Sequence, residues 1–439
     1  MSGLSRSFIS LSGERGKVSD LTDTVFSGRF YYHGKFEDLS VGVTDGVITE
    51  IGKDTKGDVR IELPHAVMPA GTDIHVHFRD PGETQKEDFR SGTISALFGG
   101  TTTVIDMPNN ILPVTDYERF ENKLNSVSSR AFCDFGLYSL FNGKNQDIID
   151  KRSFGLKIYL GGSTNALPVG ELNEHGRAFL KEYGKPVVFH AEDGKCLDSH
   201  RMEETNCRDH NLSRPVDCER TAVSEAVSFG TKRGIIAHLS APTDIASGYE
   251  VEVTPHHLLL NDSKVENSWG KVNPPLRDDH SQEELLDNYI AGRYRILSSD
   301  HAPHTEEDKS GFAHAASGII GVETRVPLFL ALVRRKIVGL DTLLSSSSTF
   351  PSALFGIRKG LIEKGYSADF ICVDFSNEVR INQDRLHSRT PVTPFHGFGA
   401  VFPSHVIIGG NIAIDGYELI EDRFGKFVDD GDLNSKAGR

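Results

Sequence analysis

The stretch AVMPAGTDIHVH, residues 66–77, is a short apolar run that ends in two histidines. It is the first of eight such runs, and the others are residues 101–109, 133–139, 154–161, 186–193, 234–240, 249–255 and 295–304. Amphipathic segments such as residues 86–100 and 220–234 separate several of them. Eight buried strands alternating with helices predict an α/β fold, a (β/α)8 TIM-like barrel. An open doubly wound sheet fits the same alternation.

Both ends of the chain have a different pattern from the middle. Residues 24–68 contain short alternating runs around Asp45-Gly46, a strong hairpin signal. Similar β-like runs return near the C-terminus, with turn-forming glycine pairs. We therefore expect a small composite β domain, a β-sandwich, from residues 23–68 plus 360–439, and a barrel over residues 69–359. The first 22 residues are rich in Ser, Gly and Arg and predict a loose or disordered N-terminal extension.

The composition excludes several classes of protein. Among the 439 residues, 38% are hydrophobic and 25% are charged, which is ordinary for a packed globular chain. Apolar runs stay short of the ~18 residues of a membrane helix, and the first residues lack the apolar centre of a secretory signal. A net charge of −14 argues against binding to nucleic acid. We expect a cytoplasmic protein without membrane or nucleic-acid partners.

Cysteine usage points to the same compartment. The five cysteines are an odd number, widely scattered and without a C-x-x-C pair. This spacing is typical of free thiols in a reducing compartment, so we expect neither a disulfide nor a zinc knuckle.

Six ionisable residues stand at or near the ends of five of the predicted strands, namely His75, His77, Lys157, His190, His238 and Asp300. In a barrel, active sites lie at this end of the strands. A period of two directs His75 and His77 to the same side of one strand. A lone strand histidine is more often a hydrogen-bonded core residue than a ligand. The whole set, however, would be costly to bury unpaired, and a metal centre would offset that cost.

Eight ordered motifs carry a resemblance to a known family. They are HVHFRDPG, DMPNN, GLKIYLG, FHAED, AHLS, VTPHHLLL, VNPPLR and SDHAPH. In this order they resemble the dihydroorotases of the amidohydrolase superfamily, over roughly residues 65–415. HxH alone is a weak signal, whereas the ordered set is specific.

The resemblance implies a centre of two divalent metal ions, usually zinc. The first ion would be held by His75, His77 and Asp300, and the second by His190 and His238. Lys157 would be an N6-carboxylysine that bridges both ions, because a carbamate supplies anionic oxygens where an ammonium would be repelled. Some dihydroorotases bridge with an aspartate instead, and GLKIYL places this chain with those that use lysine.

The resemblance also implies a reaction. A metal-bridged hydroxide would attack a ring amide carbonyl, and Asp300 would act as general base and then general acid. In reverse, these steps close N-carbamoyl-L-aspartate to L-dihydroorotate in the de novo synthesis of pyrimidines (UMP). The family pattern places substrate contacts at Arg79, Asn109, Asn273, His304, Ile320 and Gly321. A guanidinium suits the free carboxylate of this substrate.

Alternatives remain open at this stage. Allantoinase and other cyclic-amide hydrolases share the barrel and the metal ligands, and a non-catalytic scaffold on the same fold is a third reading. The resemblance implies a small-molecule substrate and a homo-oligomer. It leaves open an association with aspartate carbamoyltransferase.

Overall fold

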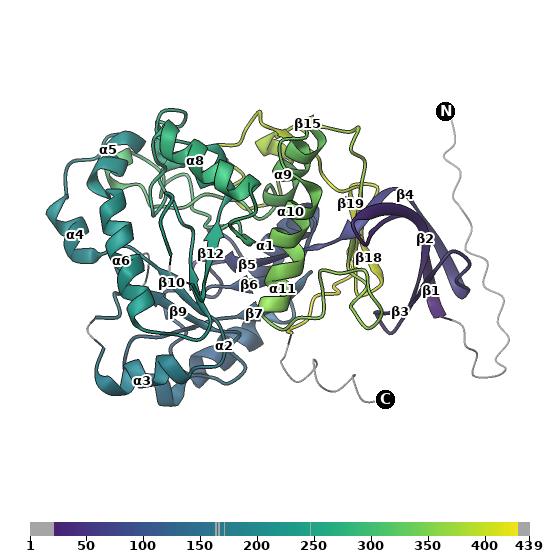
Figure 1. Cartoon of the computed structure of the whole chain (residues 1–439), viewed down its shortest axis with the longest axis horizontal. Coiled ribbons are helices and arrows are strands. Elements are labelled where there is room, and N and C mark those ends of the chain that lie inside the picture. The colour runs from purple at the N-terminus through teal and green to yellow at the C-terminus, as the bar shows by residue number, and fades with distance from the viewer. Residues whose placement is uncertain (1–21, 163–164, 166, 171, 246, 429–439) are drawn as a thin grey trace.

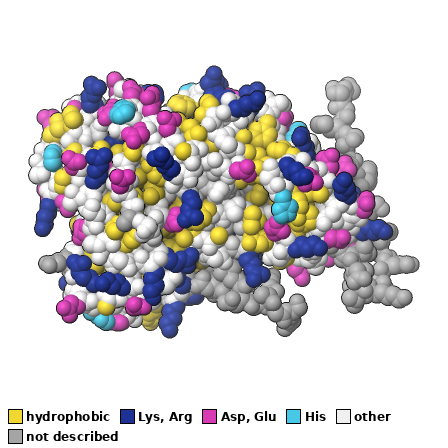
Figure 2. All heavy atoms as spheres, in the orientation of Figure 1, with side chains coloured by type: hydrophobic (Ala, Val, Ile, Leu, Met, Phe, Trp, Pro, Cys, Tyr) yellow, Lys and Arg dark blue, Asp and Glu magenta, His cyan; other side chains and the backbone are white. Residues whose placement is uncertain are grey.

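The computed structural model describes residues 22–428, apart from residues 163, 164, 166, 171 and 246. Strands β1–β4 lie at one end of the molecule, and the helices α3–α6 and α8 lie at the other end, around strands such as β9, β10 and β12 (Figure 1). No helix in the described ranges combines the length and the apolar character of a membrane span. Acidic and basic side chains are interspersed over the face in Figure 2.

The central strands follow one another in chain order and pair in parallel. They are β5 (Gly71–Val76), β6 (Thr101–Asp106), β7 (Asp134–Leu137), β8 (Ser139–Leu140), β9 (Leu156–Tyr159), β10 (Val187–His190), β11 (Gly234–Ile236), β12 (Tyr249–Val253) and β13 (Ile296–Leu297). They form sheets of three (β5 to β7) and six strands (β8 to β13). A parallel bridge joins Val76 to His301, just after β13. Each predicted apolar run thus contains a strand, and the α/β class with parallel sheets is confirmed.

Helices connect these strands. They are α1 (Phe89–Phe98), α2 (Tyr117–Val127), α3 (Glu174–Glu182), α4 (Gly194–Ser199), α5 (Cys207–Ser213), α6 (Val216–Ser228), α7 (Pro255–Leu259), α8 (Asp279–Ile290), α9 (Arg325–Arg334), α10 (Leu340–Leu344) and α11 (Phe350–Leu354). Local chemistry sets several starts, because Asp88, Asp116 and Asp278 accept hydrogen bonds from backbone N–H groups in the first turn. Helices α1, α6 and α11 pack against β6, β11 and β5, respectively.

Both chain ends build one mixed sheet of eight strands. Its strands are β1 (Thr22–Tyr32), β2 (Lys35–Thr44), β3 (Val47–Gly52), β4 (Gly57–Pro69), β14 (Phe370–Val373), β17 (His405–Ile408), β18 (Asn411–Asp415) and β19 (Glu418–Leu419). Strand β4 joins the two halves, since it pairs with β1 in parallel and with β14 in antiparallel. Asp45 and Gly46 both have positive φ in the two-residue turn between β2 and β3, as a type I′ turn requires.

The composite β region is therefore present, and the observed arrangement is one hydrogen-bonded sheet. A separate short pair, β15 (Val379–Arg380) and β16 (Gly399–Ala400), lies outside it. The sandwich arrangement and the domain boundaries stay predictions. The predicted N-terminal extension lies outside the described residues, except that Thr22 begins β1.

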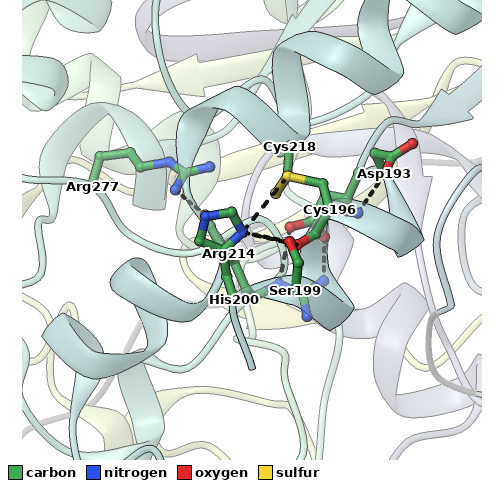
Figure 3. The surroundings of a disulfide bond; sticks show 8 residues. Asp193, Cys196, Ser199, His200, Arg214, Cys218 and Arg277 are labelled. Carbon is green, nitrogen blue, oxygen red and sulfur yellow. Dashed lines mark hydrogen bonds and ion pairs between the residues drawn. A yellow bond between two sulfur atoms is a disulfide. The ribbon is translucent and has the colours of Figure 1, made fainter. Parts of the chain in front are cut away.

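The prediction of five free cysteines was wrong. Cys196 in α4 and Cys218 in α6 form a disulfide (Figure 3), whereas Cys133, Cys207 and Cys372 are free and buried. The two partners are 22 residues apart in sequence, and their Cα atoms lie 5.3 Å apart. Sequence spacing gave no signal because the two helices become neighbours only when the chain segment after β10 turns back on itself.

We expect reduction of this disulfide to lower the free energy of unfolding by about 3 kcal/mol, because the bond restricts the unfolded chain. Chemical denaturation with and without a reducing agent measures this difference. The double variant Cys196→Ala/Cys218→Ala is the matched control, and its stability is expected not to respond to the reducing agent. Equal stability of the oxidised and reduced wild-type chain would contradict the prediction.

Candidate metal centre

The six predicted ligands meet at the carboxyl-terminal ends of the parallel strands. His75 lies in β5 and His77 just after it, Lys157 in β9, and His190 at the end of β10. His238 follows β11 and Asp300 follows β13. All six side chains line one cavity and are buried, with residue exposures of 1–9%.

The distances define two adjacent groups of ligand atoms. The nearer Asp300 oxygen, Oδ1, lies 3.3 Å from His75 Nε2 and 3.2 Å from His77 Nε2. The ligand atoms of these three residues all lie within 4.8 Å of one another, as a metal site requires. In the second group, His190 Nδ1 is 3.0 Å from His238 Nε2. Lys157 Nζ lies 3.3 Å from His75 Nε2.

The outer nitrogens of three imidazoles face acceptors. His75 Nδ1 lies 2.7 Å from the Glu252 carboxylate, and His77 Nδ1 lies 2.7 Å from Asn109 Oδ1. His190 Nε2 faces Glu192 at 3.0 Å without a hydrogen-bond partner among the described residues. For His75 and His77 the outer nitrogen therefore donates its hydrogen, which leaves the inner nitrogen with a lone pair directed at the centre. This arrangement is the one that metal-bound histidines use.

The electrostatics also favour neutral imidazoles. Burial, together with the nearby Lys157, lowers the pKa of His75 to about 3. Burial lowers the pKa of His77 and that of His238 well below the usual value. Burial likewise lowers the pKa of Lys157 to about 8, which increases the share of neutral amine. Neutral imidazoles are the metal-binding form, and a neutral amine is the form that reacts with carbon dioxide.

Backbone strain is concentrated around the centre. His238 has a φ of 38°, Asp300 of 46° and Arg79 of 59°, all in the left-handed region that non-glycine residues rarely adopt. Such a conformation costs about 1–3 kcal/mol per residue and persists only where the surroundings enforce it. The folded state therefore tolerates an unfavourable backbone conformation at these three residues, which orients their side chains.

The predicted substrate residues are distributed unevenly. Arg79, Asn109 and Asn273 line the cavity, and His304 contacts Arg79 Nη2 at 3.3 Å. Arg79 Nη1 is buried and has no hydrogen-bond partner among the described residues. Ile320 and Gly321 do not line the cavity, and the same loop contributes Ser317 and Gly318 instead. The substrate contacts of Ile320 and Gly321 stay predictions.

Sequence reasoning missed three residues at the centre: Tyr159, Glu192 and Glu252. Tyr159 lies two residues after Lys157 on the same side of β9, and its buried hydroxyl has no hydrogen-bond partner among the described residues. Glu252 is fully buried within β12, and a charged residue in a buried strand was a usable signal. Glu192 lies two residues after His190, and Arg214 holds it in place with bonds of 2.9 and 2.6 Å.

A second group of potential ligands lies away from this cavity. It consists of Cys196, His200 and Cys218, but the disulfide engages both sulfurs (Figure 3). The cluster around Asp300 therefore remains the candidate metal centre.

Comparison with known proteins agrees with this geometry. A model described as the amidohydrolase family matches residues 66–137. Proteins named dihydroorotase are 54% identical in Thermoplasma volcanium (94% of this chain, 100% of the relative) and 55% in Thermoplasma acidophilum (92% and 98%). Among solved structures, L-hydantoinase from Arthrobacter aurescens shares the fold with a TM-score of 0.85 and 24% identity, over 93% of this chain and 100% of that one.

The parallel α/β fold and the His-rich centre define a hydrolase of the amidohydrolase class that uses divalent metal. Within that class, the identity to the two Thermoplasma proteins over nearly their full length places the chain in the dihydroorotase family.

We expect Glu252→Gln to lower the affinity of the centre for divalent cations at least tenfold, because it replaces the carboxyl group that holds His75 Nδ1 with an amide. Metal retention during titration with a chelator, read by elemental analysis, measures the effect. Glu250→Gln is the matched control, since Glu250 lies in the same strand and pairs with Arg295. Equal retention in the two variants would contradict the assigned role of Glu252.

Proposed function

We propose that this chain is a dihydroorotase that interconverts N-carbamoyl-L-aspartate and L-dihydroorotate in pyrimidine synthesis. The observation that carries the proposal is the guanidinium of Arg79 in the same cavity as six potential metal ligands. A carboxylate-binding group beside a hydrolytic centre suits a cyclic amide that carries a free carboxylate. The close relatives named dihydroorotase support this choice.

Two divalent cations, most simply zinc, fit the donor set. His75, His77 and Asp300 would hold one, and His190 and His238 the other, with Lys157 between the two groups. When bound, such ions lower the pKa of a water molecule and polarise a carbonyl group. Lys157 would serve as a carbamate: its neutral amine forms a bond to the carbon of carbon dioxide and loses a proton. The product places two anionic oxygens where an ammonium would repel cations.

Asp300 is the proposed proton carrier. Its Oδ1 faces both His75 and His77, and its backbone strain fixes that orientation. The carboxylate would accept a proton from the attacking water and deliver it to the ring nitrogen that leaves. In the biosynthetic direction the transfer runs in reverse.

Four side chains would hold the rest of the substrate. Arg79 and His304 would bind the free carboxylate, and Asn109, whose Oδ1 accepts from His77, would lie beside them in the cavity. Asn273 Oδ1 already accepts hydrogen bonds from His210 and Ser317, so its amide group is oriented at the cavity edge. Backbone groups around Ile320 and Gly321 would complete the contacts, in the same loop as Ser317 and Gly318, which line the cavity.

A hydantoinase-like activity on uncharged rings is the second candidate. The fold likeness favours it, because a D-hydantoinase from Thermus sp. also has a TM-score of 0.81 over 92% of this chain, at 22% identity. An uncharged ring has no need for a guanidinium, so Arg79 separates the two activities.

The proposal includes the finer architecture. The parallel pairing in chain order and the Val76–His301 bridge support a closed (β/α)8 barrel, with the composite sheet folded as a sandwich. We also propose a cytoplasmic homo-oligomer that acts on a small molecule and binds neither membrane nor nucleic acid. Association with aspartate carbamoyltransferase is a further proposal that copurification would test.

Arg79→Gln is expected to raise KM for dihydroorotate about 100-fold, since a charged hydrogen-bond pair is lost, and Arg79→Lys should have an intermediate effect. Steady-state assays in both directions, with allantoin and hydantoin as alternative substrates, measure this. Arg90→Gln, on the surface, is the control. Wild-type turnover of the neutral rings but not of dihydroorotate would replace the proposal with the second candidate.

Lys157→Ala is expected to reduce kcat by more than about 1000-fold and to lower the metal content, because the anionic bridge is lost. Short carboxylic acids added to the assay should restore part of the activity. Lys151→Ala is the matched control, since this lysine is exposed shortly before the same strand. Full turnover by Lys157→Ala would exclude the carbamate.

A further inference from the structure

His301, next to Asp300, is a fully buried histidine that none of the roles above uses. Its ring contacts Phe78 edge-on at 5.7 Å and faces Glu87, which is also fully buried. Burying an imidazole and a carboxylate costs desolvation free energy, and an apolar pair would fill the same space at lower cost. The contacts of His301 and Glu87 therefore indicate what this buried polar pair does in the structure.

The hydrogen bonds fix the tautomer of His301. Its Nδ1 accepts from the backbone N–H of Gly321 at 3.1 Å and from that of Val322 at 3.4 Å. An acceptor nitrogen carries no hydrogen, so the proton of the neutral ring is on Nε2. Nε2 lies 3.4 Å from Glu87 Oε2. Neither of these two atoms has a hydrogen-bond partner among the described residues, so the carboxylate faces Nε2 without completing a hydrogen bond.

The backbone of His301 lies between the metal-binding strand and the loop that lines the cavity. The His77 N–H donates to His301 O at 2.7 Å, and bridges join His301 to Val76 and to Ile319. The loop then approaches closely, since a Cβ on Gly318 would lie 2.3 Å from Ala302 O. Ser317 and Gly318 form part of the cavity wall. The His301 side chain binds the same loop three residues further along, because its Nδ1 accepts from the Gly321 N–H.

We propose that His301 is a positioning residue for the substrate, and that Glu87 holds it in the required tautomer. His301 fixes the backbone of residues 317–322 against β5, so that this wall of the cavity has its shape before substrate arrives. Glu87 connects the pair to α1, because its other oxygen accepts a hydrogen bond from Ser91 Oγ. The inference rests on the proposed function for the identity of the substrate, but the loop contact stands independently of it.

Two pairs of variants test separately the hydrogen bond that His301 Nδ1 accepts and the contact of Nε2–H with Glu87. In His301→Asn the side-chain oxygen takes the place of Nδ1 and keeps an acceptor for the Gly321 N–H. In His301→Gln the amide nitrogen can reach toward Glu87, but no acceptor remains at the Nδ1 position. Glu87→Gln keeps an oxygen that faces Nε2–H, whereas Glu87→Met removes it at similar volume.

Two readouts are required. Steady-state kinetics on dihydroorotate separates KM from kcat, and amide hydrogen exchange on the substrate-free, metal-loaded protein reports on residues 317–322. For His301→Gln we expect KM to rise about tenfold, kcat to stay within threefold, and exchange in the segment to accelerate about tenfold, since a buried N–H loses its acceptor. Glu87→Met should raise KM and accelerate exchange in the segment, each by about threefold. His301→Asn and Glu87→Gln should remain close to wild type.

Two results would overturn the inference. One is wild-type KM and exchange in His301→Gln; the other is an equal rise of KM in His301→Asn and His301→Gln, which would indicate general damage to packing. Loss of metal from every variant would also overturn it, because the effect would then arise at Asp300. An inactive wild-type chain would end the dihydroorotase proposal, while the exchange comparison would still test the loop contact.

Discussion

The need to neutralise buried charge and polarity at one end of the parallel strands shapes the whole active region. Four imidazoles, a lysine and an aspartate would be costly to bury without partners, and each of them lies within 3.3 Å of another. Two acceptors, Glu252 and Asn109, direct the lone pairs of His75 and His77 inward, so the centre is organised to receive cations. Strained backbone at Asp300 and His238 is tolerated for the same purpose.

Much of the fold and of the ligand set follows from local patterns. Short apolar runs predict the strands because parallel strands are buried on both faces. His75 and His77 alternate in β5, so their shared direction follows from strand geometry alone. Ligands such as His190 were recognisable because each ends an apolar run. The two-residue turn at Asp45-Gly46 is likewise set by local conformational preference.

Other features depend on contacts that no local pattern contains. The Cys196–Cys218 disulfide forms because α4 and α6 pack together after β10. Which partner holds each outer imidazole nitrogen depends on strands far apart in sequence, as with Glu252 and His75. The pairing of His301 with Glu87 joins residues more than two hundred positions apart. In each case the residue type was visible in the sequence, but its neighbour was not.

The position of β4 has a consequence for biosynthesis of the chain. Only Ala70 separates β4 from β5, which carries His75, and one edge of β4 hydrogen-bonds to β14. Because β14 begins at Phe370, that edge has no partner until the ribosome has made most of the polypeptide. An unpaired strand edge invites association with other nascent chains. Premature termination before β14 would therefore leave an unpaired edge of β4, prone to association, directly beside β5, the strand that carries His75.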